Sequence, residues 1–128
     1  MKELKVNIPN HEYSIYIESG LLSRSGELVK EVYKGEKIAI VSDSNVAPLY
    51  SKTLIESLES AGFNAKLFCI PAGEESKCSR ELFRLYDELL DFGMTRTDMI
   101  IALGGGVVGD LTGYAAASLL RGIPFIQI

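Results

Sequence analysis

Histidine, cysteine and tryptophan are scarce in this chain. Its 128 residues include one histidine, two cysteines and no tryptophan. Transition-metal sites are usually built from clusters of His and Cys ligands, so a chain with only His11 cannot form such a site alone. Cys69 and Cys78 form neither a C-x-x-C motif nor a disulfide framework, which predicts that both thiols are reduced.

An excess of positive charge is also absent. The 13 Lys and Arg residues are outnumbered by 17 Asp and Glu residues, which gives a net charge of −4. Without a basic stripe, the sequence argues against a general binder of nucleic acid or of an anionic membrane. No apolar run reaches the roughly 18 residues that a membrane-spanning helix needs. Because residues 1–7 also lack the apolar core of a signal peptide, the expected location is the cytoplasm.

The residues that are plentiful describe an ordinary globular domain. Hydrophobic residues make up 47% of the chain and charged residues 23%, enough to build one real core. The alternating segments 3–8 and 13–17 flank turn residues at 9–12 and predict a β-hairpin with one solvent-exposed face. A short helical segment is expected within 20–33.

From residue 37 onward, apolar strands alternate with amphipathic helices. Strands are expected at 37–42, 65–70, 99–103 and 124–128, and helices between them at 48–60, 79–93 and 110–120. Such alternation implies right-handed parallel crossovers. The predicted fold is α/β: a Rossmann-like parallel sheet with helices on both faces and the N-terminal hairpin added at one side. The polar, glycine-marked segment 71–77 is expected to be an irregular loop.

The most informative stretch joins the strand at 99–103 to the next helix. Gly104, Gly106 and Gly109 match the G-x-G-x-x-G spacing, with Gly105 as an extra glycine. Glycine lets a phosphate approach the backbone closely, and the helix would point its free N–H groups and positive dipole end at that phosphate. The stretch therefore predicts a nucleotide or dinucleotide site. The alternative is that the glycines only permit close packing of strand and helix.

Three of the predicted parallel strands are followed by residues suited to a ligand. After strand 37–42 come Asp43 and Asn45; after 65–70 come Gly73, Glu74 and Lys77; after 99–103 come the glycine loop and Asp110. Because ligands of open parallel sheets bind beyond the carboxyl ends of the strands, these residues should share one rim. There Asp43 could accept hydrogen bonds from ribose or adenine, and Lys77 could pair with phosphate or a polar ring substituent.

The rim departs from the ordinary dinucleotide fingerprint, and its residues also have structural interpretations. The fingerprint sits on the first strand with an acidic residue about 20 positions later, whereas here it follows the third strand and no acid follows Asp110. Asp43 and Asn45 could cap the next helix, and the charges of 73–77 could form a solvated loop. Asp110 could be a first-turn carboxylate, and Arg121 a cation at a helix C-terminus, each stabilised simply by the helix dipole.

Three segments of the chain resemble 3-dehydroquinate synthase. The resemblance is most specific at 101–118 with 121–124, while 71–77 and 42–45 are similar to the second and first cofactor loops of that family. It spans the whole chain but only the N-terminal part of the family's length. The chain also stops inside an apolar strand, where domains seldom end. Residues 1–128 are therefore expected to be the N-terminal NAD-binding domain of a longer two-domain enzyme, without its helical C-terminal domain.

The resemblance implies an NAD-dependent lyase of the shikimate pathway. Such an enzyme converts 3-deoxy-D-arabino-heptulosonate 7-phosphate, a small sugar phosphate, to 3-dehydroquinate and phosphate. NAD and a divalent metal, zinc or cobalt, are the implied cofactors, with the metal ligands in the C-terminal domain. The resemblance also implies a homodimer. It predicts that this fragment alone does not catalyse the reaction.

Site residues follow from the resemblance by motif. The adenosine half of NAD would be contacted by Asp43 and Asn45. The ribose and nicotinamide half would be held by Glu74 and Lys77, with Gly73 in their loop. The pyrophosphate would be contacted by Gly105, Gly106 and Val107, and Asp110 would lie near the nicotinamide side. Arg121 would reach the substrate phosphate, in a neighbouring subunit's site. Ala72 stands where the family often has aspartate, which weakens the ribose assignment in that loop. The alternatives are a related sugar-phosphate cyclase, a polyol or iron-type alcohol dehydrogenase, and a free-standing nucleotide-binding module.

Overall fold

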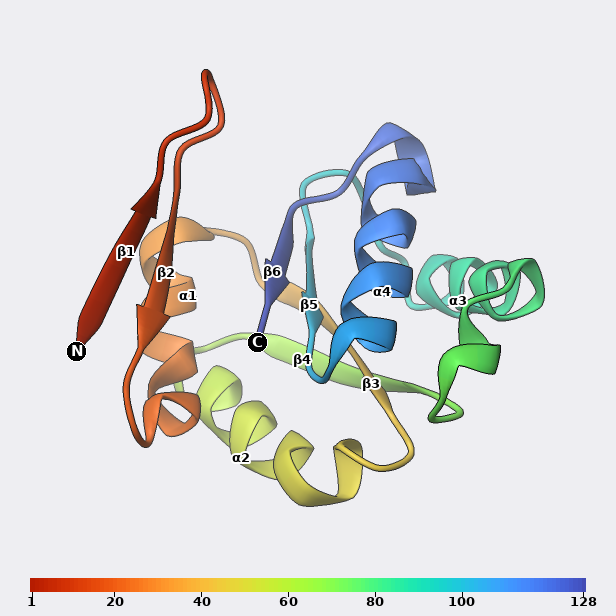
Figure 1. Cartoon of the computed structure of the whole chain (residues 1–128), viewed down its shortest axis with the longest axis horizontal. Coiled ribbons are helices and arrows are strands. Elements are labelled where there is room, and N and C mark those ends of the chain that lie inside the picture. Colours follow the sequence, from red (N-terminus) through yellow and green to blue (C-terminus); the bar gives the residue numbers. More distant parts are fainter.

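The structure, a computed structural model, describes all 128 residues. An antiparallel hairpin of β1 (Lys2–Val6) and β2 (Tyr13–Ile17) stands to one side of a four-stranded parallel sheet (Figure 1). The sheet strands are β3 (Lys37–Asp43), β4 (Asn64–Ile70), β5 (Met99–Ala102) and β6 (Phe125–Gln127), in the order β4-β3-β5-β6. The α/β fold with a parallel sheet and an added hairpin is confirmed.

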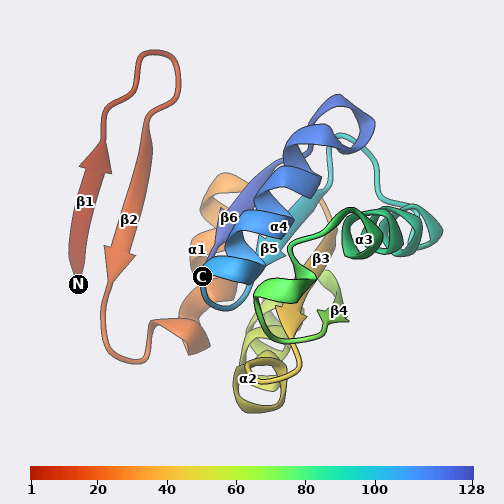
Figure 2. The same ribbon diagram turned by 45° about the vertical axis from the view of Figure 1, so that its right-hand side comes forward.

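Helices cover both faces of the parallel sheet (Figures 1 and 2). They are α1 (Ser25–Val32), α2 (Ala47–Ser60), α3 (Ser79–Asp91) and α4 (Gly106–Ser118), with 3-10 turns η1 (Leu21–Arg24), η2 (Glu74–Ser76) and η3 (Leu119–Arg121). The side chains of β3 alternate between two cores. Ile38 and Ile40 pack in the core that includes residues of α1 and α2, while Ala39 and Val41 pack in the core with residues of α3 and α4. This two-sided burial explains the uninterrupted apolar run in the sequence.

Helix α4 begins four residues earlier than the sequence predicts. It starts at Gly106 rather than near residue 110, and the backbone N–H of Gly109 already donates to the carbonyl of Gly105 at 3.0 Å. Glycine has a low helix propensity, which is why the sequence suggests a longer loop. Packing of the first helical turn on the sheet, with Val108 fully buried, overrides that local preference.

Three smaller expectations also differ from the structure. The hairpin exposes both of its faces, because Leu4 and Ile15 remain 42% exposed on the face expected to be covered. The loop 71–77 is not wholly irregular, since it contains the 3-10 turn η2. In α3 the buried positions are Glu81, Leu85 and Leu89, whereas the apolar Phe83 and Leu90, which an amphipathic helix at 79–93 would be expected to bury, are exposed.

Two findings concern the cysteines and the helices as a group. Both cysteine side chains are free, as predicted from their spacing. None of the helices has both the length and the apolar character needed to cross a membrane.

The buried Tyr33 provides a pH-dependent test of the packing between α1 and β3. Its hydroxyl donates to the carbonyl of Lys37 at 2.8 Å, and its ring stacks on Phe63. Burial, with the charge of Asp98 adding to it, raises the pKa of Tyr33 above its ordinary value of 10.0. The folded state therefore holds the neutral phenol more firmly than the unfolded chain does. This stabilisation is complete below about pH 10 and is lost as the pH rises through the raised pKa.

Tyr33→Phe should remove this pH dependence. We expect a loss of about 1 kcal/mol in the free energy of unfolding at pH 7, from the missing hydrogen bond. Above pH 10 the stability of the variant should fall less steeply than that of the wild type. Urea unfolding between pH 7 and 11 measures both effects, and Tyr50→Phe, at an exposed position of α2, is the control. Equal alkaline slopes for wild type and Tyr33→Phe would contradict the assignment.

Candidate nucleotide-binding site

The strand order places a topological switch point at the carboxyl ends of β3 and β5. The chain leaves β3 into α2 on one face of the sheet and leaves β5 into α4 on the other face, so the two connections diverge between these neighbouring strands. Ligands of open α/β sheets bind at such a switch point. The two strand ends are joined beneath it, because the buried Ser42 hydroxyl donates to the carbonyl of Leu103 at 2.7 Å. Asp43 and the glycine loop thus lie beside the same switch point.

The glycine loop presents bare backbone at that switch point. Helix α4 has no side-chain cap, so the N–H groups of its first turn, at Gly106, Val107 and Val108, have no side-chain acceptor. A Cβ atom added at Gly105 or Gly106 would meet nothing within 4 Å. The space that their missing side chains leave open allows an anion to reach these N–H groups. The loop therefore fits the pyrophosphate of a dinucleotide.

The third glycine of the motif has different surroundings. A Cβ atom at Gly109 would collide with the side-chain amide of Gln127 on β6. The space at Gly109 is thus occupied by the flexible end of a side chain from β6. The glycines of the motif therefore differ: Gly105 and Gly106 border open space, whereas Gly109 contacts Gln127.

Lys77 connects the loop after β4 to helix α4. Its Nζ lies 2.8 Å from Oδ2 of Asp110 and 3.5 Å from Oε2 of Glu74. The hydrogen bond to Asp110 raises the pKa of Lys77, so its ammonium group stays charged throughout the neutral range. Because α4 begins at Gly106, Asp110 lies beyond the first turn, and its partner is this lysine rather than the helix dipole. The predicted convergence of these two residues on one rim is thus observed.

The interpretation of Asp43 and Asn45 as helix caps is wrong, because α2 has Val46 at its N-cap and no side-chain cap hydrogen bond. One of the carboxylate oxygens of Asp43, Oδ1, accepts the backbone N–H groups of Asn45 at 2.9 Å and Val46 at 2.8 Å. These bonds hold the turn that leads from β3 into α2. The second oxygen, Oδ2, makes no hydrogen bond within the chain. Holding this turn and binding a ligand are therefore compatible, since each would use a different oxygen.

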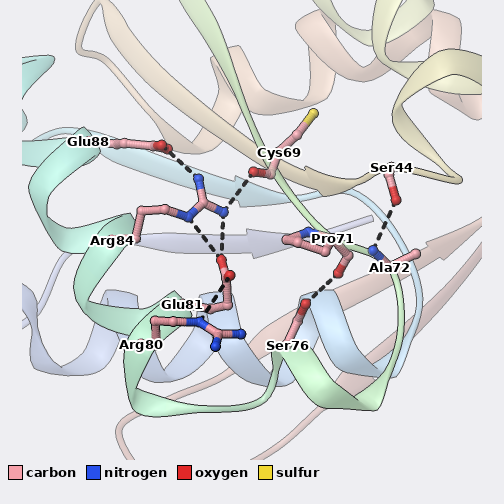
Figure 3. Close-up of polar contacts among 9 residues, drawn as sticks. All are labelled: Ser44, Cys69, Pro71, Ala72, Ser76, Arg80, Glu81, Arg84 and Glu88. Carbon is pink, nitrogen blue, oxygen red and sulfur yellow. Dashed lines mark hydrogen bonds and ion pairs between the residues drawn. The ribbon is translucent and has the colours of Figure 1, made fainter.

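The loop after β4 rests on polar contacts that sequence reasoning missed (Figure 3). Glu81 is only 6% exposed and accepts two hydrogen bonds from the Arg84 guanidinium, at 2.9 and 2.6 Å. Arg84 in turn donates to the carbonyl of Cys69 at 3.1 Å, at the end of β4. The buried Ser76 hydroxyl donates to the carbonyl of Pro71 at 2.5 Å and closes the loop on itself. A polar residue at a buried helical position, as Glu81 is, is the kind of signal that could have revealed this support.

Arg121 lies away from the other predicted residues. It is the last residue of η3, which directly follows the C-terminal end of α4, whereas the glycine loop lies at the N-terminal end of α4. A helix of 13 residues is about 20 Å long, so Arg121 and the glycine loop lie at opposite ends of it. Leu120 and Arg121 both adopt left-handed backbone conformations, with φ of 50° and 66°. Such strain in residues other than glycine is concentrated at functional positions.

No group of three or more His, Cys, Asp and Glu side chains in the chain is arranged to hold a metal ion. The residues on the rim are instead backbone amides, one lysine and carboxylates. That combination suits a polar, phosphate-bearing organic ligand.

The fold is an α/β domain of the type found in sugar-phosphate cyclases and dehydrogenases. The structure of 2-deoxy-scyllo-inosose synthase matches the chain with a TM-score of 0.88 at 20% identity. The match covers 98% of this chain and 35% of the synthase chain. 2-Epi-5-epi-valiolone synthase from Streptomyces hygroscopicus, solved with NAD+ and Zn2+ bound, matches 90% of the chain and 31% of its own, with a TM-score of 0.77 at 28% identity. Glycerol dehydrogenase from Schizosaccharomyces pombe is less similar, with a TM-score of 0.65 at 25% identity over 84% of this chain and 25% of that one.

By sequence, the chain is similar to 3-dehydroquinate synthases. Residues 67–128 match the family model described as 3-dehydroquinate synthase N-terminal. The chain is 48% identical over 128 residues to 3-dehydroquinate synthase of Desulforamulus reducens and 50% identical over 126 residues to that of Streptococcus suis. These alignments include 100% and 98% of the chain, and the chain spans 36% of the length of each relative. The family resemblance predicted from the glycine segment is confirmed.

Proposed function

We propose that this chain is the NAD-binding part of a 3-dehydroquinate synthase. The observation that carries the proposal is the identity of 48% over the whole chain, joined to a glycine loop open to phosphate at the switch point of the sheet. The complete enzyme would convert 3-deoxy-D-arabino-heptulosonate 7-phosphate to 3-dehydroquinate and phosphate. When bound, NAD supplies a reversible hydride acceptor for a hydroxyl of the substrate.

The chain's own residues would bind and orient the dinucleotide. The first-turn N–H groups of α4, at Gly106 and Val107, with Gly105 beside them, would donate to the pyrophosphate. On the adenosine side, the free Oδ2 of Asp43 would accept a ribose hydroxyl, with the exposed Asn45 beside it. On the other side, the loop of Gly73, Glu74 and Lys77 would hold the ribose and nicotinamide half, with Asp110 fixing the Lys77 ammonium.

Two further parts of the proposal involve groups outside a single copy of this chain. Arg121 lies at the opposite end of α4 from the glycine loop, which supports a role in a neighbouring subunit's substrate site and hence a homodimer. The zinc or cobalt ion of the reaction would be held by residues outside these 128, where a Lewis acid would polarise the substrate hydroxyl.

The test uses the full-length protein that carries this chain. We expect it to release phosphate and form 3-dehydroquinate from the heptulosonate phosphate, with catalytic NAD and no net accumulation of NADH at 340 nm. Net NADH formation from a polyol or alcohol would instead show a dehydrogenase. Turnover of a different sugar phosphate would show a related cyclase. Absence of NAD binding would leave a nucleotide-binding module for another ligand. Each of these three outcomes contradicts the proposal.

The isolated 128-residue chain should form no 3-dehydroquinate. Part of the wall of the NAD and substrate pocket would lie outside it. The isolated chain should therefore also bind NAD more weakly than the full-length protein does. Phosphate release and isothermal titration calorimetry on the two proteins, side by side, measure both expectations. Turnover by the isolated chain would contradict the proposed division of the site.

A further inference from the structure

Ser44 lies in the first of the two loops proposed to hold opposite halves of NAD, and its side chain contacts the second loop at Ala72 (Figure 3). It follows Asp43, the last residue of β3, which pairs in register with Ile70, the last residue of β4. The next residues of each chain segment therefore leave the sheet side by side. Pro71 has no N–H group, so Ala72 carries the first backbone N–H beyond β4.

The Ser44 residue bonds to this segment in both directions. Its backbone N–H donates to the carbonyl of Ile70 at 3.1 Å. Its hydroxyl oxygen accepts the N–H of Ala72 at 3.0 Å. This is the only hydrogen bond between a side chain of the segment 43–46 and the loop 71–77. Beyond the end of the sheet, the Ser44 hydroxyl is thus the one side chain that ties the first loop to the second.

Each loop is otherwise held by its own contacts. Asp43 organises the first loop through Asn45 and Val46, and Ser76 closes the second loop on Pro71. Loss of the Ser44 hydroxyl would therefore leave both loops folded. What would change is the position of one loop relative to the other.

We propose that Ser44 is a positioning residue that couples the two cofactor loops, so that both halves of one dinucleotide are bound at a fixed spacing. This rests on the proposed function, because it assigns the first loop to adenosine and the second to the nicotinamide half. The Ser44 hydroxyl acts through Ala72 and does not itself contact the ligand. A dinucleotide that spans both loops depends on the coupling, whereas a mononucleotide held by the first loop and the glycine loop does not.

The test compares Ser44→Ala, Ser44→Thr and Ser23→Ala in the full-length protein. Ser23 provides a matched control because its hydroxyl also bonds a backbone group, the carbonyl of Gly20 at 2.8 Å, far from the rim. In Ser44→Ala without ligand, hydrogen exchange of the Ala72 amide should quicken about threefold to tenfold, the range for one exposed hydrogen bond. NAD affinity should fall by a similar factor, while affinity for AMP stays within about twofold. Ser44→Thr, which keeps the hydroxyl, and Ser23→Ala should match the wild type.

Three results would overturn the coupling while the proposed function stands: NAD binding to Ser44→Ala unchanged from the wild type, an equal loss of NAD and AMP affinity, or unaltered exchange at Ala72. An equal loss would mean that Ser44 contacts the adenosine half directly. Absence of NAD binding by the wild type would overturn the proposed function, and the coupling with it. The hydrogen-exchange measurement needs no ligand, so it tests the hydrogen bond between Ser44 and Ala72 whether or not NAD binds.

Discussion

Replacing Gly106 by alanine should weaken NAD binding by about tenfold to a hundredfold while leaving the fold intact. The added methyl group would enter the open space in front of the first-turn N–H groups of α4. It would cost one or more hydrogen bonds to a charged phosphate, each of which contributes about 1.5–3 kcal/mol. The fold should not suffer, because the methyl group meets no atom within 4 Å. Alanine also favours the helix over glycine by about 0.8–1 kcal/mol.

The matched control is Gly113→Ala in the same helix. A Cβ atom there would lie 3.5 Å from the Phe125 ring, an ordinary van der Waals contact. This variant should gain a similar helical stability and keep wild-type NAD affinity. Calorimetry on the full-length protein measures the affinities, and urea unfolding measures the stabilities. If Gly106→Ala binds NAD like the wild type, the pyrophosphate does not approach this loop.

Gly26→Ala should be the most destabilising small substitution at a glycine of the chain. Helix α1 crosses α2 at this residue, where the Gly26 N–H donates to the Ser57 hydroxyl at 2.9 Å. A Cβ atom there would lie 2.8 Å from the Ser57 carbonyl carbon and closer still to its oxygen. These are backbone atoms of a packed helix, so neither can turn aside as a flexible side chain would. Forcing the helices apart should cost about 2–3 kcal/mol of unfolding free energy.

Urea unfolding of Gly26→Ala beside Gly113→Ala separates the clash from the general effect of a glycine-to-alanine change in a helix. Gly113→Ala should be as stable as the wild type or slightly more stable. A stability of Gly26→Ala within about 0.5 kcal/mol of the wild type would mean that the helices separate freely at this crossing. NAD binding by the folded fraction of Gly26→Ala should be retained, because α1 lies away from the rim.

Much of the site could be predicted because its residues are adjacent to strand ends. A strand that is buried on both faces appears as an apolar run, as at 99–103, and the residues that follow it must emerge at the rim. Asp43, Lys77 and the glycine loop all have this position. The exact start of α4 could not be predicted, because local glycine preference and packing of Val108 on the sheet oppose each other there, and packing prevails.

Other features depend on which segments meet. Lys77 had many charged residues in the sequence as potential partners, and only the crossing of the second loop over α4 selects Asp110. Glu81 appeared as one more charge on an amphipathic helix, until α3 packed it beneath β4 with Arg84. The hairpin's apolar face was expected to be covered on the strength of its alternation. Burial, however, is a property of neighbours and not of pattern.

The sequence by itself determined the alternation of strands and helices, the glycine-rich turn before α4 and the resemblance to 3-dehydroquinate synthases, because these depend on contiguous residues. Only the tertiary structure decided the strand order that places the switch point between β3 and β5. It also showed that Gly105 and Gly106 border open space whereas Gly109 contacts the Gln127 side chain, and it placed Arg121 at the far end of α4. The physical reason is the same in each case. Propensity and periodicity act over a few neighbouring residues, whereas contacts between distant segments exist only once the backbones have packed together.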